Sequence, residues 1–334
     1  MDLLTKSSDN ANLKPVNRDL ESVTITDIEN HKLISDKELS RDLKNLDNFT
    51  VTDYKDQYQN ANIFYGNPTL YHFQFKNLLK CTREHGKSIY DIWNDPESRS
   101  KLLDQTRLRN RGGKTAAGNI FECFRINTGS VVMFKSTTAK YMYAKYGAKK
   151  VLDPTAGWGG RMLGAWSLGI DYTGIDTNIE LKTAYDNMMK YLNNYDNDDY
   201  FETSRGNLNM IWQSCLDVDF SKIDYDFVLT SPPYINMEIY QHMTPWQSRD
   251  SFYTDFFMPL WQKSMDNIRP GGKVCYNISP RMFTEAQAHG LPDPDLEEDL
   301  LQQLGQQTGK KKQDKVYIWA RWRGHRKTSI ISVT

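Results

Sequence analysis

The chain has 334 residues, 39% of them apolar, which is enough for one large α/β domain and an accessory segment of roughly 100 residues. Its formal net charge is zero, so overall charge predicts no polyanionic partner. The four scattered cysteines include no CxxC pair, which argues against a zinc site and indicates reduced thiols inside a cell. No apolar signal core or membrane-length run is present, so we expect a soluble, cytoplasmic protein without a membrane partner.

The N-terminal part of the chain lacks a sustained hydrophobic period. Residues 1–60 are polar and charged with single aliphatics, and we predict an extended or partly disordered arm. Residues 61–130 are predicted to form a helical accessory region that could bind nucleic acid. Within it we expect helices at 69–85, 88–93 and 98–108, followed by a basic loop at 109–114.

Positive charge is concentrated between Lys101 and Lys150. Eleven Lys and Arg residues stand there against Asp104 and Glu122, a local excess of nine positive charges. Such a stripe suits a phosphate-binding surface. A solvated basic face explains the same composition equally well, and the sequence leaves both interpretations open.

Short apolar runs alternate with longer amphipathic runs after Lys149, a texture typical of a parallel α/β sheet. We predict strands at 151–152, 171–175, 210–212, 226–230 and 273–278. Helices are expected at 161–168, at 177–193 with a capping box at Thr177–Glu180, and at 249–268 with a bend at Pro259. Residues 315–322 and 328–333 are predicted to form a closing antiparallel hairpin, and the polar insert 279–314 a mobile loop.

A glycine-rich loop follows the first predicted strand, in the segment Val151-Leu-Asp-Pro-Thr-Ala-Gly-Trp-Gly-Gly160. Glycines there let the backbone approach a ligand, and the next helix presents free N–H groups to an anion. Asp176 ends the second strand, 19 residues after Gly157, where a carboxylate can accept hydrogen bonds from ribose hydroxyls. The pattern predicts a nucleoside-containing cofactor. Met162 stands where a dinucleotide fingerprint needs its third glycine, which disfavours a dehydrogenase.

The fourth strand ends abruptly in Ser231-Pro-Pro-Tyr234. The two prolines fix φ and remove two backbone donors, which favours free carbonyl acceptors at the carboxyl edge of the sheet. Such acceptors suit a donor NH2 group, and the Tyr234 ring can stack on a planar base. We expect this loop to lie beside the glycine-rich loop at the switch point of the sheet.

Together the two motifs resemble the amino-methylating DNA methyltransferases, over roughly residues 134–333. The resemblance implies a Rossmann-like seven-stranded methyltransferase sheet with the closing hairpin, and S-adenosyl-L-methionine as cofactor. It assigns catalysis to the loop residues Ser231, Pro232, Pro233 and Tyr234. It assigns cofactor binding to Phe134, Lys135, Thr137, Asp153, Pro154, Thr155, Ala156, Gly157, Gly159, Asp176, Thr177, Ser214, Cys215 and Asp217.

The assignment after the third strand departs from the family pattern. An acid there often holds the cofactor adenine, whereas this chain has Ser214, with Asp217 three residues later. We predict a methyltransferase domain over residues 131–334. No target-recognition domain follows it, so recognition would come from the N-terminal 130 residues or the insert.

The predicted reaction is methyl transfer to an exocyclic amino group of a DNA base, with cytosine N4 favoured over adenine N6. Carbon-5 methylation is disfavoured because no Pro-Cys pair occurs. RNA or tRNA base methylation, protein glutamine methylation and a catalytically silent nucleic-acid-binding protein remain alternatives. Asn236, Tyr240 and His242 are expected near the same pocket.

Overall fold

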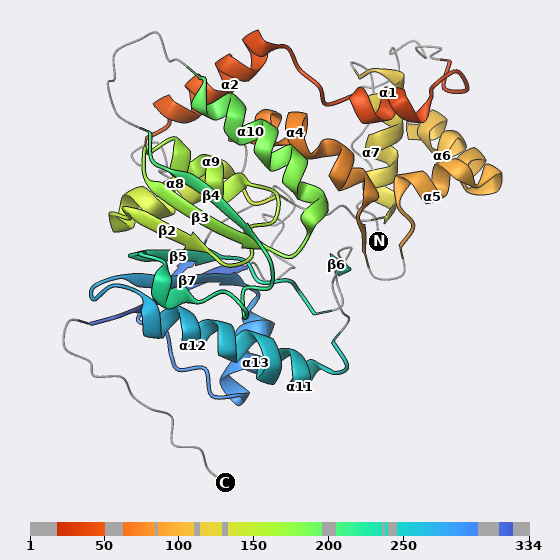
Figure 1. Ribbon diagram of the computed structural model, residues 1–334. Helices are drawn as coiled ribbons and strands as arrows, with labels where there is room; N and C mark the ends of the chain where they lie inside the picture. The colour runs from red at the N-terminus through yellow and green to blue at the C-terminus, as the bar shows by residue number, and fades with distance from the viewer. Residues whose placement is uncertain are drawn as a thin grey trace, which may run out of the picture. The chain divides into compact units, whose positions relative to one another are not determined.

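The computed structural model describes residues 19–50, 63–83, 86–109, 114–128, 133–195, 205–235, 238–239, 246–299 and 314–322 (Figure 1). The chain divides into two compact units. One comprises Met1–Lys32 and Leu78–Val131, and the other comprises Leu33–Asn77 and Val132–Thr334. Residues 33–77 therefore belong to the larger unit, together with the residues that follow Val131.

The smaller unit is helical in its described part. Its elements are α1 (Ile25–Asn30), β1 (Thr82–Arg83), α5 (Ile89–Asn94), α6 (Pro96–Arg109) and α7 (Ala116–Thr128). Capping boxes open two of these helices, Thr24 with Asp27 at α1 and Ser88 with Asp91 at α5. The helices predicted at 88–93 and 98–108 are confirmed by α5 and α6.

The prediction of an extended arm over residues 1–60 is wrong for its described part. Both α1 and α2 (Asp36–Asn48) lie there, and α2 begins at a Ser35–Glu38 capping box. Leu39, Leu43 and Leu46 are buried at helical spacing, so the scattered aliphatics form one apolar stripe. The ammonium of Lys140 donates to the carbonyls of Leu46 and Asp47, at the last turn of α2. This helix is thus an integral part of the larger unit.

The larger unit is built on a seven-stranded sheet with the order β4-β3-β2-β5-β7-β9-β8. Its strands are β2 (Lys150–Asp153), β3 (Asp171–Asp176), β4 (Leu208–Trp212), β5 (Phe227–Thr230), β7 (Lys273–Ile278), β8 (Leu296–Asp299) and β9 (Lys315–Ala320). The first five positions are parallel, β9 is antiparallel to β7, and β8 is antiparallel to β9. The predicted Rossmann-like sheet is confirmed. A further short strand, β6, spans Glu238–Ile239.

The closing hairpin differs from the prediction. The strand that pairs with β9 at the edge is β8, which lies within the insert expected to be a mobile loop. That insert also contains the helix α13 (Pro280–Ala288). The edge strand β8 is mostly exposed and acidic, so it lacks the apolar alternation that marks a strand in sequence. The expected partner strand at 328–333 lies outside the described residues.

Two sets of helices cover the sheet in the larger unit (Figure 1). The set α8, α9 and α10 lies on one face, and the set α11, α12 and α13 lies on the other. Their bounds are α8 (Ser136–Tyr146), α9 (Gly160–Trp166), α10 (Lys182–Asn193), α11 (Arg249–Phe252) and α12 (Met258–Asn267), with α4 at Asn67–Lys80. A π-helical turn, Tyr253–Phe257, lies between α11 and α12, and Pro259, where we predicted a bend, stands in the first turn of α12.

The predicted capping box at Thr177–Glu180 is wrong in detail. The cap is Asn178, whose side chain accepts from the Glu180 N–H and opens a 3-10 turn, Ile179–Leu181, before α10. The shift leaves Thr177 exposed directly after β3. Its side chain is thereby free of any capping bond to the helix.

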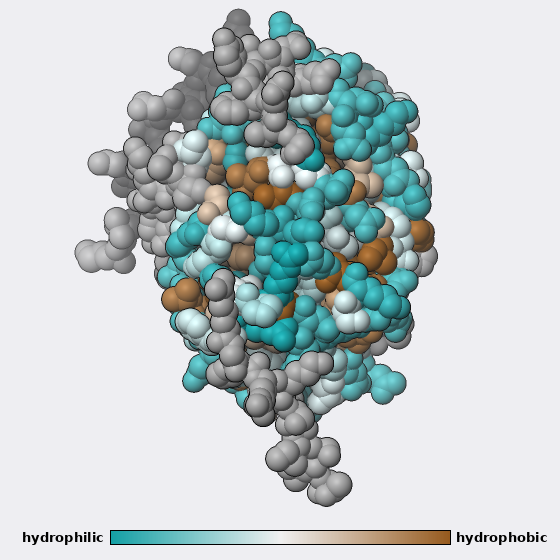
Figure 2. Space-filling model, turned by 60° about the vertical axis from the view of Figure 1, so that its left-hand side comes forward, coloured by the Kyte–Doolittle hydropathy of each residue, from teal (hydrophilic) through white to brown (hydrophobic). Residues whose placement is uncertain are grey.

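The surface is mixed in character. On the face seen in Figure 2, hydrophobic residues form small separate patches among hydrophilic ones. Within the described segments, no helix combines the length and apolar character needed to span a bilayer.

Candidate active site

Four loops of the predicted site follow four neighbouring parallel strands. They are Ser214–Asp217 after β4, Asp176–Thr177 after β3, Thr155–Gly159 after β2 and Ser231–Tyr234 after β5. The carboxyl ends of parallel strands lie at the same edge of a sheet, where ligands of open α/β sheets bind. The strand order therefore arranges the predicted cofactor and catalytic residues in one row.

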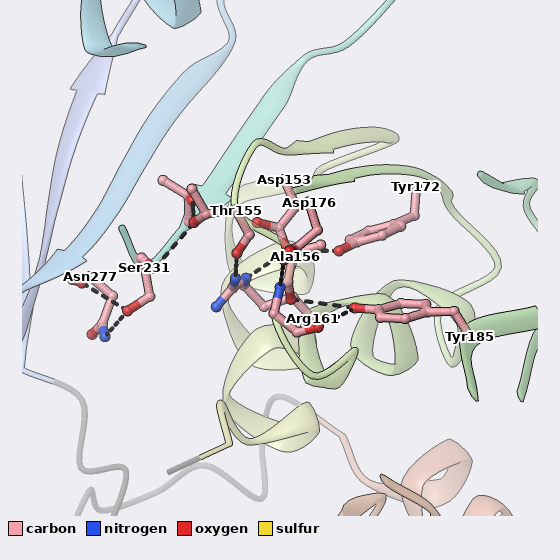
Figure 3. A network of polar contacts seen from close by, with 11 residues as sticks. Asp153, Thr155, Ala156, Arg161, Tyr172, Asp176, Tyr185, Ser231 and Asn277 are labelled. Carbon is pink, nitrogen blue, oxygen red and sulfur yellow. Dashed lines mark hydrogen bonds and ion pairs between the residues drawn. The ribbon is translucent and has the colours of Figure 1, made fainter. Parts of the chain in front are cut away.

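Thr155 joins the glycine-rich loop directly to the catalytic loop (Figure 3). Its hydroxyl donates to the carbonyl of Ser231 at 3.1 Å and lies 2.6 Å from the hydroxyl of Thr230. The adjacency arises from the parallel pairing of β2 with β5, in which Leu152 lies opposite Val228. The Ser231 carbonyl, expected to be free, is thus occupied. Among the described residues, no backbone N–H bonds to the Pro232 carbonyl.

The two loop glycines have different roles. Gly157 has φ +59°, and a Cβ added there would have no neighbour nearer than the Thr155 carbonyl at 3.9 Å. The position therefore faces open space that a ligand can fill. Gly159 has φ +90°, but its Cβ would come within 2.7 Å of the Met188 side chain on α10. This second glycine is required by packing and backbone conformation, and the expected closeness to a ligand is not needed to explain it.

Asp176 closes the other side of the glycine turn. Its carboxylate accepts from the N–H of Gly157 and from the N–H of Asn178, each at 2.8 Å. Burial raises the pKa of this carboxyl to about 6, although both hydrogen bonds favour the ionised form. The buried Tyr185 on α10 donates to the Gly157 carbonyl at 2.9 Å. The turn is thus held from two sides, with the Asp176 carboxylate beside the open position.

Asp153, predicted to bind cofactor, is fully buried beneath the loop. One of its oxygens accepts from the Arg161 guanidinium at 2.7 Å and from the Tyr172 hydroxyl at 2.7 Å (Figure 3). Arg161 also donates to the Thr155 carbonyl. Asp153 therefore acts on the loop through Arg161, because no part of its side chain is exposed to a ligand.

The segment Phe134–Thr138 passes beside the same loop. A Cβ on Gly160 would lie 1.9 Å from the Phe134 carbonyl, so this backbone crosses the first residue of α9 in direct contact. Lys135 and Thr137 are each only 2% exposed. Desolvation lowers the pKa of Lys135 to about 8, and its ammonium lies 4.5 Å from the centre of the Phe64 ring. The segment lies beside the loop, but the side chains of Lys135 and Thr137 are directed into the protein.

The loop after β4 presents two of its three predicted residues at or near the surface. Asp217 is exposed, and Ser214 is half-buried with its hydroxyl accepting from the Leu216 N–H. Cys215 is buried in the apolar core that packs against α11–α13. Burial raises the pKa of its thiol to about 12, so the thiol stays protonated and is a poor nucleophile.

The catalytic loop has two partners that the sequence did not identify. Ser231 donates to the backbone carbonyl of Asn277 at 3.3 Å, and the Asn277 side-chain amide donates to the Ser231 hydroxyl at 3.5 Å. Tyr234 donates to the carboxylate of Asp314 at 2.6 Å. A polar residue ending the apolar strand 273–278 was the available signal for Asn277. The neighbouring predictions Asn236, Tyr240 and His242 lie outside the described residues.

The basic stripe between Lys101 and Lys150 is largely neutralised in the fold. Acidic side chains pair with six of its members, Lys101, Arg107, Lys114, Arg125, Lys145 and Lys150. Lys135 and Lys140 are buried. Arg109 and Lys149 are exposed, and Arg111 lies outside the described residues. Of the ten members that the structure describes, eight are therefore either paired with an acidic side chain or buried.

No protein-family model matches the chain, and no curated protein matches it. Solved structures similar to it include TrmN from Thermus thermophilus, at TM-score 0.38 and 14% identity over 56% of this chain and 48% of that one. An RNA methyltransferase from Salinibacter ruber in complex with S-adenosyl-L-homocysteine matches at TM-score 0.36 and 16% identity, over 59% and 97%. A Listeria monocytogenes protein described as a class I S-adenosylmethionine-dependent methyltransferase matches at 0.40 and 14%, over 87% and 90%.

The chain thus spans about half the length of TrmN and most of the other two. Its strand order and antiparallel closing pair define the Rossmann-like seven-stranded methyltransferase fold. All the identities are low, so the case for a particular reaction depends on the residues of the site. Within the described part of the chain, no three His, Cys, Asp or Glu residues are grouped to hold a metal.

Proposed function

We propose that the chain is an S-adenosyl-L-methionine-dependent methyltransferase whose cofactor lies over the loop Thr155–Gly159. The fit is supported by Gly157, where the position of a Cβ is open, and by the adjacent Asp176 carboxylate, an acceptor for ribose hydroxyls. Thr177, Ser214 and Asp217 would contact the adenine end, and Phe134 the methionine end. The bound cofactor supplies a methyl group already activated on a sulfonium.

The proposed acceptor is an exocyclic amino group of a nucleic-acid base. The observation that carries this proposal is the hydrogen bond from Thr155 to the Ser231 carbonyl, which fixes the catalytic loop beside the cofactor loop. The Ser231 hydroxyl and the Pro232 carbonyl would accept the two N–H groups and direct the nitrogen lone pair toward the methyl carbon. Tyr234 would stack on a base rotated out of its helix.

Among targets, we favour cytosine N4 in DNA, with adenine N6 close behind, because a serine opens the catalytic loop. The neutralised basic stripe gives no support to either nucleic acid. RNA is the first alternative substrate. Attack at cytosine carbon 5 is disfavoured by chemistry, because burial raises the pKa of both Cys215 and Cys275 and keeps the thiols protonated.

The test is incubation of the purified protein with methyl-labelled cofactor and unmodified duplex DNA, single-stranded DNA, tRNA or mRNA. Digestion and mass spectrometry then identify the methylated nucleoside. We expect N4-methylcytosine or N6-methyladenine from DNA in the wild type and a much smaller, still measurable amount in Ser231→Ala. Label in RNA alone would replace DNA by RNA as the substrate, and label in protein would redirect the proposal to glutamine methylation.

A catalytically silent protein is separated by calorimetry with S-adenosyl-L-methionine. We expect one binding site in the wild type, and an affinity about ten- to a hundredfold weaker in Asp176→Asn, which should remain folded. Failure of the wild type to bind the cofactor would contradict the proposed function outright.

A further inference from the structure

The side chain of Asn277 has an arrangement that core packing does not explain. It is 4% exposed, and its carbonyl oxygen Oδ1 is buried without a hydrogen-bond partner among the described residues. A buried acceptor without a partner costs stability, because it has given up its hydrogen bonds to water. An apolar residue at this position would avoid that cost. The amide therefore needs another reason to be there.

The register of the sheet places Asn277 beside the catalytic loop. Strands β5 and β7 are parallel, with Thr230 opposite Tyr276, so the next step along both strands brings Ser231 next to Asn277. Val274, Tyr276 and Ile278 point into the apolar core against α11–α13. Alternation along the strand puts the Asn277 side chain on the other face, with Ser231 (Figure 3).

The hydrogen bonds around Ser231 determine which way its hydroxyl points. A serine hydroxyl has one proton and two acceptor lone pairs. The proton is donated to the Asn277 backbone carbonyl at 3.3 Å, and one lone pair accepts from the Asn277 Nδ2 at 3.5 Å. One lone pair is left. In this arrangement the hydroxyl can only accept a hydrogen bond from an incoming group.

We propose that Asn277 is a positioning residue that fixes the Ser231 hydroxyl as an acceptor and so selects amino groups over carbonyl groups at the target position. This inference rests on the proposed function. A base that presents NH2, cytosine or adenine, can donate to the oriented hydroxyl. A base that presents a carbonyl at the same place would set two acceptors against each other, with no proton between them.

The test uses Asn277→Leu, which is similar in shape and removes both polar atoms, and Asn277→Ala in case leucine is too large. We expect kcat for amino methylation to fall about tenfold in either variant, the effect of one lost orienting hydrogen bond. The KM for S-adenosyl-L-methionine should stay unchanged. Ser264→Ala is the matched control, because it removes a buried hydroxyl that donates to the Leu260 carbonyl within α12.

A double-mutant cycle separates positioning from a general structural effect. If Asn277 acts through Ser231, then Asn277→Leu should cost nothing further in a Ser231→Ala background. An equal loss of kcat in both backgrounds, or an unchanged kcat in the single variants, would overturn the inference.

Thermal denaturation tests the inference independently of activity. Because the unpartnered Oδ1 disappears, we expect the Tm of Asn277→Leu to equal or exceed that of the wild type. A Tm lower by several degrees in both the Leu and Ala variants would make Asn277 a structural residue and overturn the inference. A wild type that methylates no amino group would instead refute the proposed function, and the denaturation result would still decide the role of Asn277.

Discussion

The hydroxyl of Tyr234 donates a 2.6 Å hydrogen bond to the carboxylate of Asp314, which links the catalytic loop to the residue just before β9. Asp314 is half-buried, and desolvation raises the pKa of its carboxyl while the bond from Tyr234 lowers it. The aromatic ring therefore has two separable properties, its flat face and its tethered hydroxyl. Variants at this position can distinguish them.

Tyr234→Phe keeps the ring and removes the tether. We expect it to retain kcat within about tenfold and to lose about 1–3 kcal/mol of stability, the cost of a buried acceptor left without its donor. Tyr234→Ala also removes stacking, which is worth about 1–3 kcal/mol per base, and should raise the KM for nucleic acid by roughly ten- to a hundredfold. Steady-state kinetics measures kcat and KM of the two variants, and urea denaturation measures their stability. Equal kinetic losses in the two variants would argue against stacking.

Gly157→Ala tests whether a ligand occupies the open side of the glycine turn. The left-handed φ of +59° costs an alanine about 1–2 kcal/mol, but the added methyl meets no protein atom within 3.9 Å. We expect a folded protein whose affinity for S-adenosyl-L-methionine, measured by calorimetry, is at least tenfold lower. Gly147→Ala is the matched control, because φ is +67° and its Cβ position is equally empty. A similar affinity in both variants would remove the cofactor from this turn.

Asp176 predicts opposite pH trends for cofactor binding and for the stability of the free protein. The ionised carboxylate is the stronger acceptor for ribose hydroxyls, so we expect affinity to fall as pH drops below about 6. The folded-state pKa is raised by burial, so this group's contribution to stability declines as pH rises from its usual value toward about 6. Calorimetry between pH 5 and 8 measures the affinity, and denaturation between pH 4 and 8 measures the stability.

The control for that experiment is Asp176→Asn, which cannot ionise. Its cofactor affinity should be weaker by about ten- to a hundredfold, the value of a hydrogen bond to a charged group, and independent of pH over this range. A pH dependence that persists in the variant would assign the titration to another residue.

The buried pair between Arg161 and Asp153 should be structural. Breaking a buried ion pair from one side leaves an uncompensated charge, so Arg161→Ala is expected to lose about 3–5 kcal/mol in urea denaturation. Lys182→Ala removes one partner of an exposed pair with Asp186 and should cost less than about 1 kcal/mol. If Arg161→Ala instead lost little stability but no longer bound the cofactor, Arg161 would be assigned to direct contact with the cofactor.

The central strands could be predicted closely from the sequence because they are short buried apolar runs bounded by turn residues. The strand predicted at 226–230 corresponds to β5 (Phe227–Thr230), and the strand predicted at 273–278 corresponds to β7. Both motif loops follow such strands, so their meeting at one edge was also predictable. The bond that joins them, from Thr155 to the Ser231 carbonyl, depends on side-chain geometry that no spacing reveals.

The elements and contacts that the sequence analysis missed have a common physical cause, because the local sequence gives little indication of them. The edge strand β8 is exposed and acidic, and Glu297 pairs with Lys315 of β9 only once the chain has folded. The short helix α1 has one fully buried residue, Ile28, and depends on its capping box. Asn277 and Asp314 lie 46 and 80 residues from their partners Ser231 and Tyr234, so only the tertiary structure brings them together.

The π-helical turn Tyr253–Phe257 constrains how this part of the chain can change in length. A π turn holds one residue more than a regular helical turn, so deleting one residue there would restore regular winding and leave α11 and α12 in nearly the same register. Phe252, buried at 0% exposure, would keep its place in the core. A single-residue deletion should therefore be tolerated within the turn, whereas a deletion inside α12 would rotate α11 by about 100° relative to the rest of that helix.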